Sequence, residues 1–345
     1  MTPLSWSLLV SFLKANVIYG GLLGTAAGMT LAERKVSAWM QYSIGPNRVG
    51  PWGLLQPIAD LVKFIFKEEL MPDGANKWLF RLAPLIAAVP AMLTIAVIPF
   101  GPAIPVPFGP VDHTNFSIAD LDIGLMYLLA IGGLSIYGVI LGGWASNSKF
   151  SLLGGLRASA QMISYELTLI LVILAVVTMS GSLSLRGVVE GQTTLLQWNV
   201  FHQPLAFGLF VVAAFAETNR HPFDFAECEP ELVGGFHTEY SSMRFALFFL
   251  GEYCAMIVMA CLSTTLFFGG YSVPFWENAP WFVAIPAFLA KSAAFLFLYL
   301  WVRWTLPRFR FDQLMHLGWK VFLPLALLNL FLTGAAISFG VNLPW

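Results

Sequence analysis

Charged residues are scarce in this chain. Of its 345 residues, 11% are Asp, Glu, Lys or Arg, while 58% are hydrophobic. An ordinary soluble domain carries roughly 25% charged residues. So few charges cannot cover the surface of a water-soluble protein of this size, and the mean hydropathy of +0.75 indicates a membrane protein with several spans. The composition therefore excludes a soluble enzyme, a disordered chain and a nucleic-acid-binding protein.

The chain is also poor in the residues and motifs that bind cofactors. It has three cysteines, too few for an iron–sulfur cluster and without a Cys-x-x-Cys pair, so we expect them to be small packing residues. They are Cys228, Cys254 and Cys261. The five histidines are scattered without metal-ligand spacing. The segment GPNRVGPWG lacks the Lys and Ser/Thr of a phosphate loop. We therefore expect no nucleotide, flavin, iron–sulfur cluster, haem or metal to be bound by this chain alone.

Long apolar runs are what the chain has in abundance. A transmembrane helix needs roughly 20 apolar residues, and eight stretches meet or approach that length, the fifth being the shortest. They are 7–31, 78–100, 122–145, 157–180, 202–219, 240–268, 282–305 and 319–341. The sequence therefore predicts an all-α, polytopic membrane protein that forms a single membrane domain over 1–345.

The basic residues predict an orientation for these spans. Of the 18 lysines and arginines, 15 lie in the loops and helix ends on the side that follows the first span, and Arg186 alone lies on the opposite side. Lys14 and Lys291 lie within spans. The positive-inside rule therefore places both termini outside, and the loops 32–77 and 220–240 in the cytoplasm or its equivalent.

Part of the first inner loop has helical rather than loop periodicity. Apolar side chains share one face of a helix over 56–69, with charged side chains on the other. The apolar set is Ile58, Leu61, Val62, Ile65 and Phe66. This pattern predicts an amphipathic helix along the membrane interface, although a helix packed on the protein would show the same pattern.

Two spans carry glycines four residues apart. Gly20, Gly24 and Gly28 share one face of the first span, and Gly138 and Gly142 share one face of the third. Such small-residue faces are typical of close helix packing in membranes.

Five ionisable residues fall within predicted spans, where charge is costly and a functional role is the first hypothesis. The carboxylates Glu166, Glu217 and Glu252 fall in the inner half of their spans, and Lys14 and Lys291 fall in the outer half. The set predicts a path for protons across the membrane. Structural ion pairs remain the alternative for any single member.

The second inner loop is densely acidic. Over about 20 residues it carries six carboxylates, with only Arg220 and Arg244 as local compensation. The carboxylates are Glu217, Asp224, Glu227, Glu229, Glu231 and Glu239. Because like charges this close cannot all ionise comfortably, some should hold protons near neutral pH. The loop is therefore a candidate proton store, and the alternative is an ordinary solvated acidic loop.

Long, specific motifs in these loops resemble one family. The segments 32–69 and 217–253 resemble the two signature regions of the H subunit of respiratory complex I, the family of mitochondrial NADH–ubiquinone oxidoreductase chain 1. The segments 144–169 and 306–320 also match, and the likeness covers nearly the whole chain. A bacterial form fits best.

The resemblance implies a role in a multi-subunit enzyme. The chain would be a subunit of a proton-pumping NADH:quinone oxidoreductase, multi-pass in the bacterial inner membrane (or its mitochondrial counterpart) with periplasmic termini. It would have no catalysis of its own. Ubiquinone would be the substrate at a site shared with two peripheral-arm subunits, and small membrane subunits and lipid would be the other neighbours.

The resemblance also assigns residues. It implies that Arg34, Phe223 and Asp224 line the quinone chamber. The implied proton path comprises Glu166, Glu217, Asp224, Glu227, Glu229, Glu231, Glu239 and Glu252. From the residues alone Arg34 could instead be a positive-inside anchor. Other functions also stay open: a subunit of a related membrane-bound hydrogenase, a stand-alone cation/proton antiporter, or an inert docking platform.

Overall fold

The computed structural model describes residues 3–105, 113–227, 229–276 and 279–339. The regular structure of this part of the chain is helical, apart from a small antiparallel pair in which β1 (Ile104–Pro105) faces β2 (His113–Thr114). The main helices are α1 (Pro3–Met40), α2 (Gln56–Phe66), α3 (Lys77–Leu93), α4 (Gly124–Ala145), α5 (Lys149–Ser180), α6 (Leu185–Glu190), α7 (Asn199–His202), α8 (Pro204–Glu217), α9 (Glu229–Leu232), α10 (Ser242–Phe267), α11 (Trp281–Thr305), α12 (Phe311–Leu317) and α13 (Leu323–Ser338).

Seven of the eight expected spans are present, within the described residues, as helices long and apolar enough to cross a membrane. Two are compound helices. A short 3-10 turn, Thr94–Val97, extends α3, and a π-helical turn, Gly318–Phe322, joins α12 to α13. The all-α polytopic prediction is confirmed.

The fifth expected span, 202–219, is not one long helix. The structure divides it into α7 and α8, which break at Gln203 (φ −133°, ψ 60°). Pro204 explains the break, because proline lacks an N–H and disfavours the helical conformation in the residue before it. At 1.5 Å per residue, the 14 residues of α8 reach about 21 Å, short of a bilayer core of about 30 Å.

The first helix is longer than the sequence predicted. The span was expected to end at residue 31, but α1 continues to Met40 and reaches about 57 Å. Its buried face keeps one helical periodicity through the extension, since Ala26, Met29, Glu33 and Val36 are all buried. The residues 32–40 are therefore helix rather than loop, so the helix backbone holds the positions of Glu33 and Arg34.

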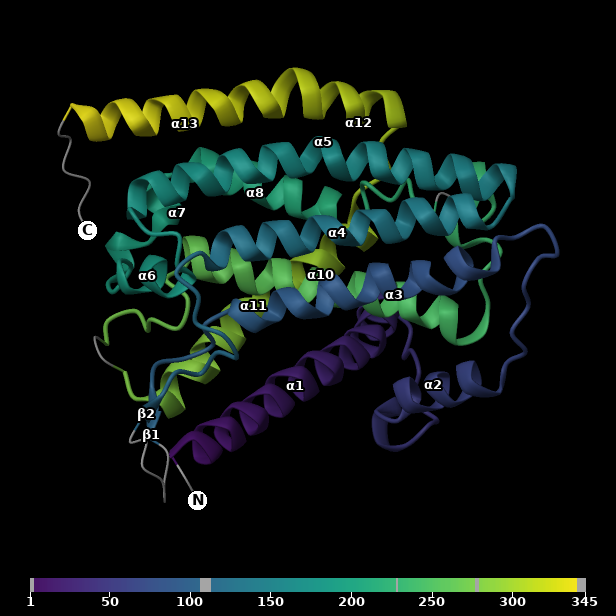
Figure 1. The fold of residues 1–345 in the computed structure, drawn as a ribbon, viewed down its shortest axis with the longest axis horizontal. Helices are drawn as coiled ribbons and strands as arrows, with labels where there is room; N and C mark the ends of the chain where they lie inside the picture. The colour runs from purple at the N-terminus through teal and green to yellow at the C-terminus, as the bar shows by residue number, and fades with distance from the viewer. Residues whose placement is uncertain (1–2, 106–112, 228, 277–278, 340–345) are drawn as a thin grey trace.

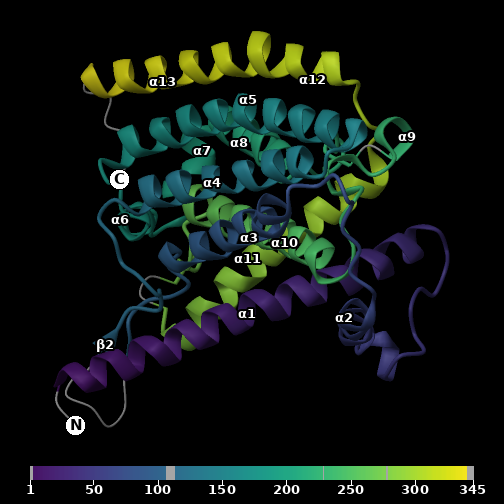
Figure 2. The same ribbon diagram turned by 45° about the vertical axis from the view of Figure 1, so that its right-hand side comes forward.

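The helices form layers (Figure 1). The α12–α13 segment covers α5 on one side, α4 follows α5, then α3, α10 and α11, and α1 crosses the opposite side obliquely. The turned view shows the same order, with α8 behind α5 (Figure 2). The start of α1, the β1–β2 pair, α6 and the end of α13 lie at one end of the bundle, and α2 lies at the other. Segments that the sequence assigns to one side of the membrane thus share one end.

The apolar face of α2 is uncovered by the rest of the chain. None of its residues is buried, and Ile58, Ile65 and Phe66 are each more than half exposed. The exposed apolar face is available to lipid or another subunit, while the rest of α2 contacts α1 and α10, where Arg34 pairs with Asp60 and the Phe64 ring meets Phe245. The helix ends at Phe66, three residues before the predicted end.

The two glycine faces behave differently. A Cβ at Gly138 would clash with the backbone nitrogen of Ala87, so this glycine permits the close approach of α4 to α3 as predicted. A Cβ at Gly20, Gly24 or Gly28 would meet nothing within 4 Å. The first glycine face therefore packs against no described part of the chain.

Candidate functional site: a buried carboxylate cavity

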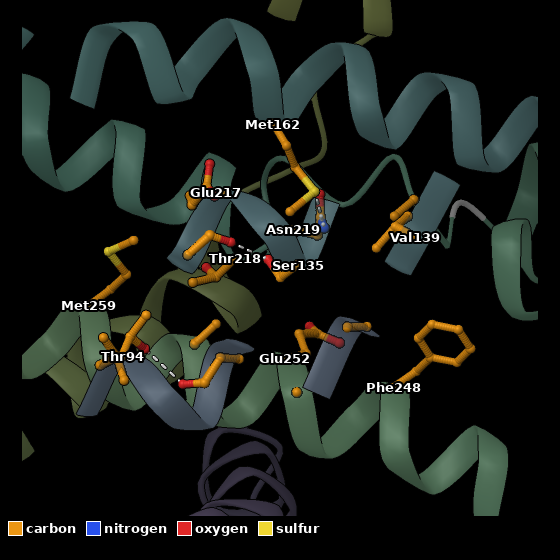
Figure 3. A pocket seen from close by; sticks show the side chains of 18 of the residues that line it. Thr94, Ser135, Val139, Met162, Glu217, Thr218, Asn219, Phe248, Glu252 and Met259 are labelled. Atoms are coloured by element: carbon orange, nitrogen blue, oxygen red, sulfur yellow. Dashed lines mark hydrogen bonds between the residues drawn. The ribbon is translucent and has the colours of Figure 1, made fainter. Parts of the chain in front are cut away.

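The three carboxylates expected inside the membrane meet at one cavity. Glu166 from α5, Glu217 from the end of α8 and Glu252 from α10 all line it, and Glu227 of the acidic loop joins them. Figure 3 shows Glu217 and Glu252, on different helices, among the side chains that line this space. Three distant segments thus contribute acids to a single internal volume.

The cavity is polar only at a few points. Its volume is about 90 Å³, enough for about three water molecules at roughly 30 Å³ each. Thr94, Ser135, Thr218 and Asn219 add polar side chains, whereas most of the remaining wall is apolar. Because an apolar wall lowers the local dielectric, charge or protons at these carboxylates interact more strongly than they would in water.

Local backbone features place the acids. Glu217 ends α8, and its Oε2 is buried and accepts no hydrogen bond from the described residues. Glu166 lies within α5 against Gly133 of α4, where a Cβ would come within 2.7 Å of the Glu166 Oε1. The absence of a side chain at Gly133 therefore gives the Glu166 carboxylate its place in the cavity.

Glu252 belongs to a buried network of opposite charges. Arg220 Nε lies 2.6 Å from Glu252 Oε1, and Arg220 Nη1 lies 3.3 Å from Glu33 Oε1. Arg303 also pairs with Glu33, and the Tyr253 hydroxyl donates to Glu33 Oε2 at 2.5 Å. The Arg220 guanidinium also lies 4.5 Å from the centroid of the Tyr253 ring. The network joins α1, α10, α11 and the segment after α8 beside the cavity.

Sequence reasoning missed Glu33, Arg303 and Tyr253, and it treated Arg220 only as compensation for the acidic loop. A signal for Glu33 was present, because it continues the buried face of α1 that includes Ala26 and Met29. Ending the span at residue 31 hid that pattern. No comparable signal marks Arg303, whose partner lies 270 residues away in the chain.

Asp224 of the acidic loop has one partner from outside the loop and one from within it. Arg308 Nη2 lies 2.9 Å from Asp224 Oδ2, and His221 Nε2 lies 3.1 Å from the same oxygen. Although burial opposes ionisation, these two partners hold the pKa of Asp224 below its usual value. Asp224 is therefore ionised at neutral pH and is not among the loop carboxylates that could hold a proton there.

The other loop carboxylates have different surroundings. Arg157 pairs with Glu231 at 2.5 Å, whereas Arg244, expected to compensate the loop, pairs with Glu69 at 2.9 Å. Glu239 is half-buried in the turn before α10. Glu229 begins α9, but its side chain lies outside the described residues, as does Cys228.

The residues expected at the quinone chamber each contact different partners within the described part of the chain. Arg34, about half exposed, pairs with Asp60 of α2 at 2.7 Å and so joins α1 to the amphipathic helix. Phe223 is buried, and its ring stacks on Phe309 at 5.7 Å between centroids. Among the described residues, no hydrogen bond, ion pair or ring contact links Arg34 to Phe223 or Asp224.

The two lysines within spans do not line the cavity; each binds polar groups of other segments. Lys291 Nζ donates to the carbonyl oxygens of Phe268, Gly270 and Ser272 at 2.6–3.0 Å, just after α10 ends. Lys14 Nζ donates to Thr114 Oγ1 and the Asn115 carbonyl. Both lysines have structural partners, which favours the structural alternative for them. Cys254 and Cys261 are buried, in keeping with packing.

Comparison with known proteins gives a consistent result. A family model described as NADH dehydrogenase matches residues 13–334. An NADH-quinone oxidoreductase H subunit of Geobacter metallireducens, the first of its numbered forms, is 50% identical over 97% of this chain and 98% of its own length. Subunit 8 of the same enzyme from Rhodothermus marinus is 47% identical over 97% of this chain and 98% of its own. The H subunit from Leptospira biflexa is 49% identical over 93% of each.

Proposed function

Because the chain belongs to the H-subunit family of NADH-quinone oxidoreductase and is a multi-pass membrane subunit of that enzyme, we propose that its buried cavity carries protons coupled to quinone reduction. The observation that carries this proposal is the convergence of Glu166, Glu217 and Glu252 with Glu227 on one internal volume. A hydrogenase subunit and a stand-alone antiporter are set aside, since the relatives are named as quinone oxidoreductase subunits, whereas an inert docking platform is tested by the variants below.

The proposed proton path would begin at a quinone site near the inner end of α1 and near α2. Arg34 lies toward the inner end of α1 and pairs with Asp60 on the charged face of α2, and the opposite, apolar face of α2 is exposed and suited to a lipid-soluble substrate. The guanidinium can hold a carbonyl in a fixed direction, which a point charge cannot do. Phe223 and Asp224 already contact other residues of this chain, so they cannot by themselves enclose a quinone. We therefore place quinone at a site shared with other subunits. Two peripheral-arm subunits would complete that site.

The acidic loop supports the link between the two regions. Asp224 is held by His221 and Arg308, while Glu227, three residues further along the chain, already lines the cavity. Charge that appears on the quinone would thus be felt first at Asp224 and then at Glu227. Glu229, Glu231 and Glu239 would be the outer members of the same acidic group.

Electrostatic magnitudes favour a relay over a single residue. A unit charge about 10 Å away is worth about 1.7 kcal/mol at an effective dielectric near 20. Moving one charge against 100 mV takes about 2.3 kcal/mol. One carboxylate that responds to quinone therefore supplies too little free energy, whereas several coupled carboxylates and their ion pairs could supply enough.

The positive-inside distribution supports the orientation of this path. It places the acidic loop and α2 on the cytoplasmic side of the bacterial inner membrane and both termini on the periplasmic side. The peripheral arm would then dock over the loop, and neighbouring membrane subunits and lipid would cover the outer helix faces.

Neutral carboxylate variants test the path. Glu166→Gln, Glu217→Gln and Glu252→Gln keep the shape of each side chain but cannot release a proton. In membrane vesicles, each variant should assemble, since in Glu252→Gln the Arg220 guanidinium keeps Glu33 as its partner. Each should reduce ferricyanide with NADH normally but lose most of its quinone-coupled proton uptake. Glu217→Gln should be affected most, because Glu217 lies where the loop leaves the membrane helix. The matched control is Glu190→Gln, because Glu190 pairs with Arg186 at the other end of the bundle, away from the cavity. Wild-type pumping in all three variants would show that the carboxylates are structural.

A further inference from the structure

One ionisable side chain that lines the cavity is not a carboxylate. His237 ends the 3-10 turn Gly235–His237, between the acidic loop and α10, and lines the same volume as Glu227 and Glu252. Its side chain is 11% exposed. His237 therefore lies between the acidic loop, which carries Glu227, and α10, which carries Glu252.

Aromatic rings hold this imidazole in place. Phe236, Phe245 and Phe249 meet it edge to face, with centroids 5.0, 5.1 and 5.8 Å away. His237 Nδ1 lies 3.9 Å from Glu227 Oε1, so a shift of less than about 1 Å brings the two atoms to hydrogen-bond distance. The ring is therefore confined, yet within reach of the acidic loop.

We propose that His237 is a proton-relay residue that passes protons between Glu227 of the acidic loop and the carboxylates of the membrane cavity. The proposal rests on the proton path proposed above and adds a residue to it. The geometry carries it: a confined imidazole lies beside one acid and opens on the cavity that holds the others.

An imidazole suits this position better than another carboxylate would. Two acids in direct contact cannot both be ionised at low cost in an apolar cavity, because like charges repel there. A neutral imidazole accepts a proton at one ring nitrogen while it gives up the proton on the other. One proton enters and one leaves, so the ring stays neutral overall. Exchange of the ring proton between the two nitrogens, through water in the cavity, then restores the starting tautomer.

The surroundings keep the ring in its neutral form. Burial lowers the pKa of His237 to about 4, although the nearby Asp224 charge opposes the change. At pH 7 only about one ring in a thousand is then protonated at rest. A neutral resting state is the one that can both accept and donate.

The test uses the whole enzyme in membrane vesicles and three substitutions at one position. His237→Gln keeps hydrogen-bonding groups but cannot relay a proton. His237→Phe keeps the aromatic contacts but has no ring nitrogen. His237→Ala leaves space that added imidazole can fill. His316→Gln, on the exposed surface of α12, is the matched control. The readouts are NADH-driven proton uptake, quinone reduction and ferricyanide reduction.

We expect the Gln and Phe variants to lose roughly tenfold or more in proton uptake, as for removal of a positioned acid–base group. Ferricyanide reduction and the His316→Gln control should be unchanged. Added imidazole should restore part of the proton uptake in the Ala variant, an effect that a purely structural residue would not show.

Three results would overturn the proposal. These are wild-type proton uptake in His237→Gln, wild-type uptake in His237→Phe, and no response of His237→Ala to imidazole. The experiment distinguishes an error in the His237 relay from an error in the proposed proton path. If Glu217→Gln is defective while His237→Gln is normal, only the relay is wrong. If Glu166→Gln, Glu217→Gln and Glu252→Gln are all normal, the proton path itself is wrong.

Discussion

Replacing Arg220 by methionine should destabilise the protein, because Arg220 is the shared cation of two buried acids. Its side chain is 5% exposed, and those of Glu33 and Glu252 are 9% and 19% exposed. Arg220→Met keeps a long apolar side chain but leaves Glu252 without its cation. Glu33 keeps Arg303 and Tyr253.

The size of the effect follows from this geometry. With about 4 Å between charge centres and an effective dielectric near 20, the Arg220–Glu252 attraction is about 4 kcal/mol. Removing one partner of a buried ion pair typically costs about 3–5 kcal/mol, because the remaining charge stays buried. Since whole proteins are stable by only about 5–15 kcal/mol, much of the variant protein should fail to assemble.

A second substitution separates lost attraction from lost packing. In Arg220→Met/Glu252→Gln, neither charge remains at the pair, and we expect at least half of the lost stability to return. The assay compares the amount of assembled complex on native gels, and its dissociation temperature, for the parent, both single variants and the double variant. A double variant as unstable as Arg220→Met, or an Arg220→Met protein that assembles like the parent, would refute the ion-pair reasoning.

Three further predictions concern the chamber, the cavity and pH. Arg34→Lys should assemble but reduce quinone more slowly, with ferricyanide reduction unchanged; equal quinone activity would make Arg34 an anchor. Gly133→Ala should displace the Glu166 carboxylate, which lies 2.7 Å from the added Cβ, and lower proton uptake. Gly208→Ala, with nothing within 4 Å, should not. The lowered pKa of His237, from 6.5 to about 4, favours the folded state by about 3 kcal/mol above pH 6.5. That contribution should disappear as pH falls through about 4, and thermal stability of His237→Gln should depend less on pH between these values.

Composition and periodicity predicted the membrane class and most helices. Seven spans follow from apolar length alone, and the face of α2 follows from the spacing of Ile58, Leu61 and Ile65. Helix boundaries were harder to predict. The length of an apolar run predicts only the part of a helix that lies in lipid. The helix α1 continues beyond its apolar run, and Glu33 in this extension forms ion pairs with Arg220 and Arg303.

The sequence by itself determined which residues are costly to place in a membrane. Glu166, Glu217 and Glu252 interrupt apolar runs, and a charge in hydrocarbon is costly unless it has a functional or structural role. Tertiary structure decided what each such residue does. Helix packing brings these acids to one cavity and adds His237, while Lys14 and Lys291 bind polar groups of other segments instead. It also supplies Arg220, Arg303 and Arg308 to acids far away in the chain. The physical reason is that burial, distance and charge pairing set the state of an ionisable group, and all three depend on neighbours that sequence spacing does not reveal.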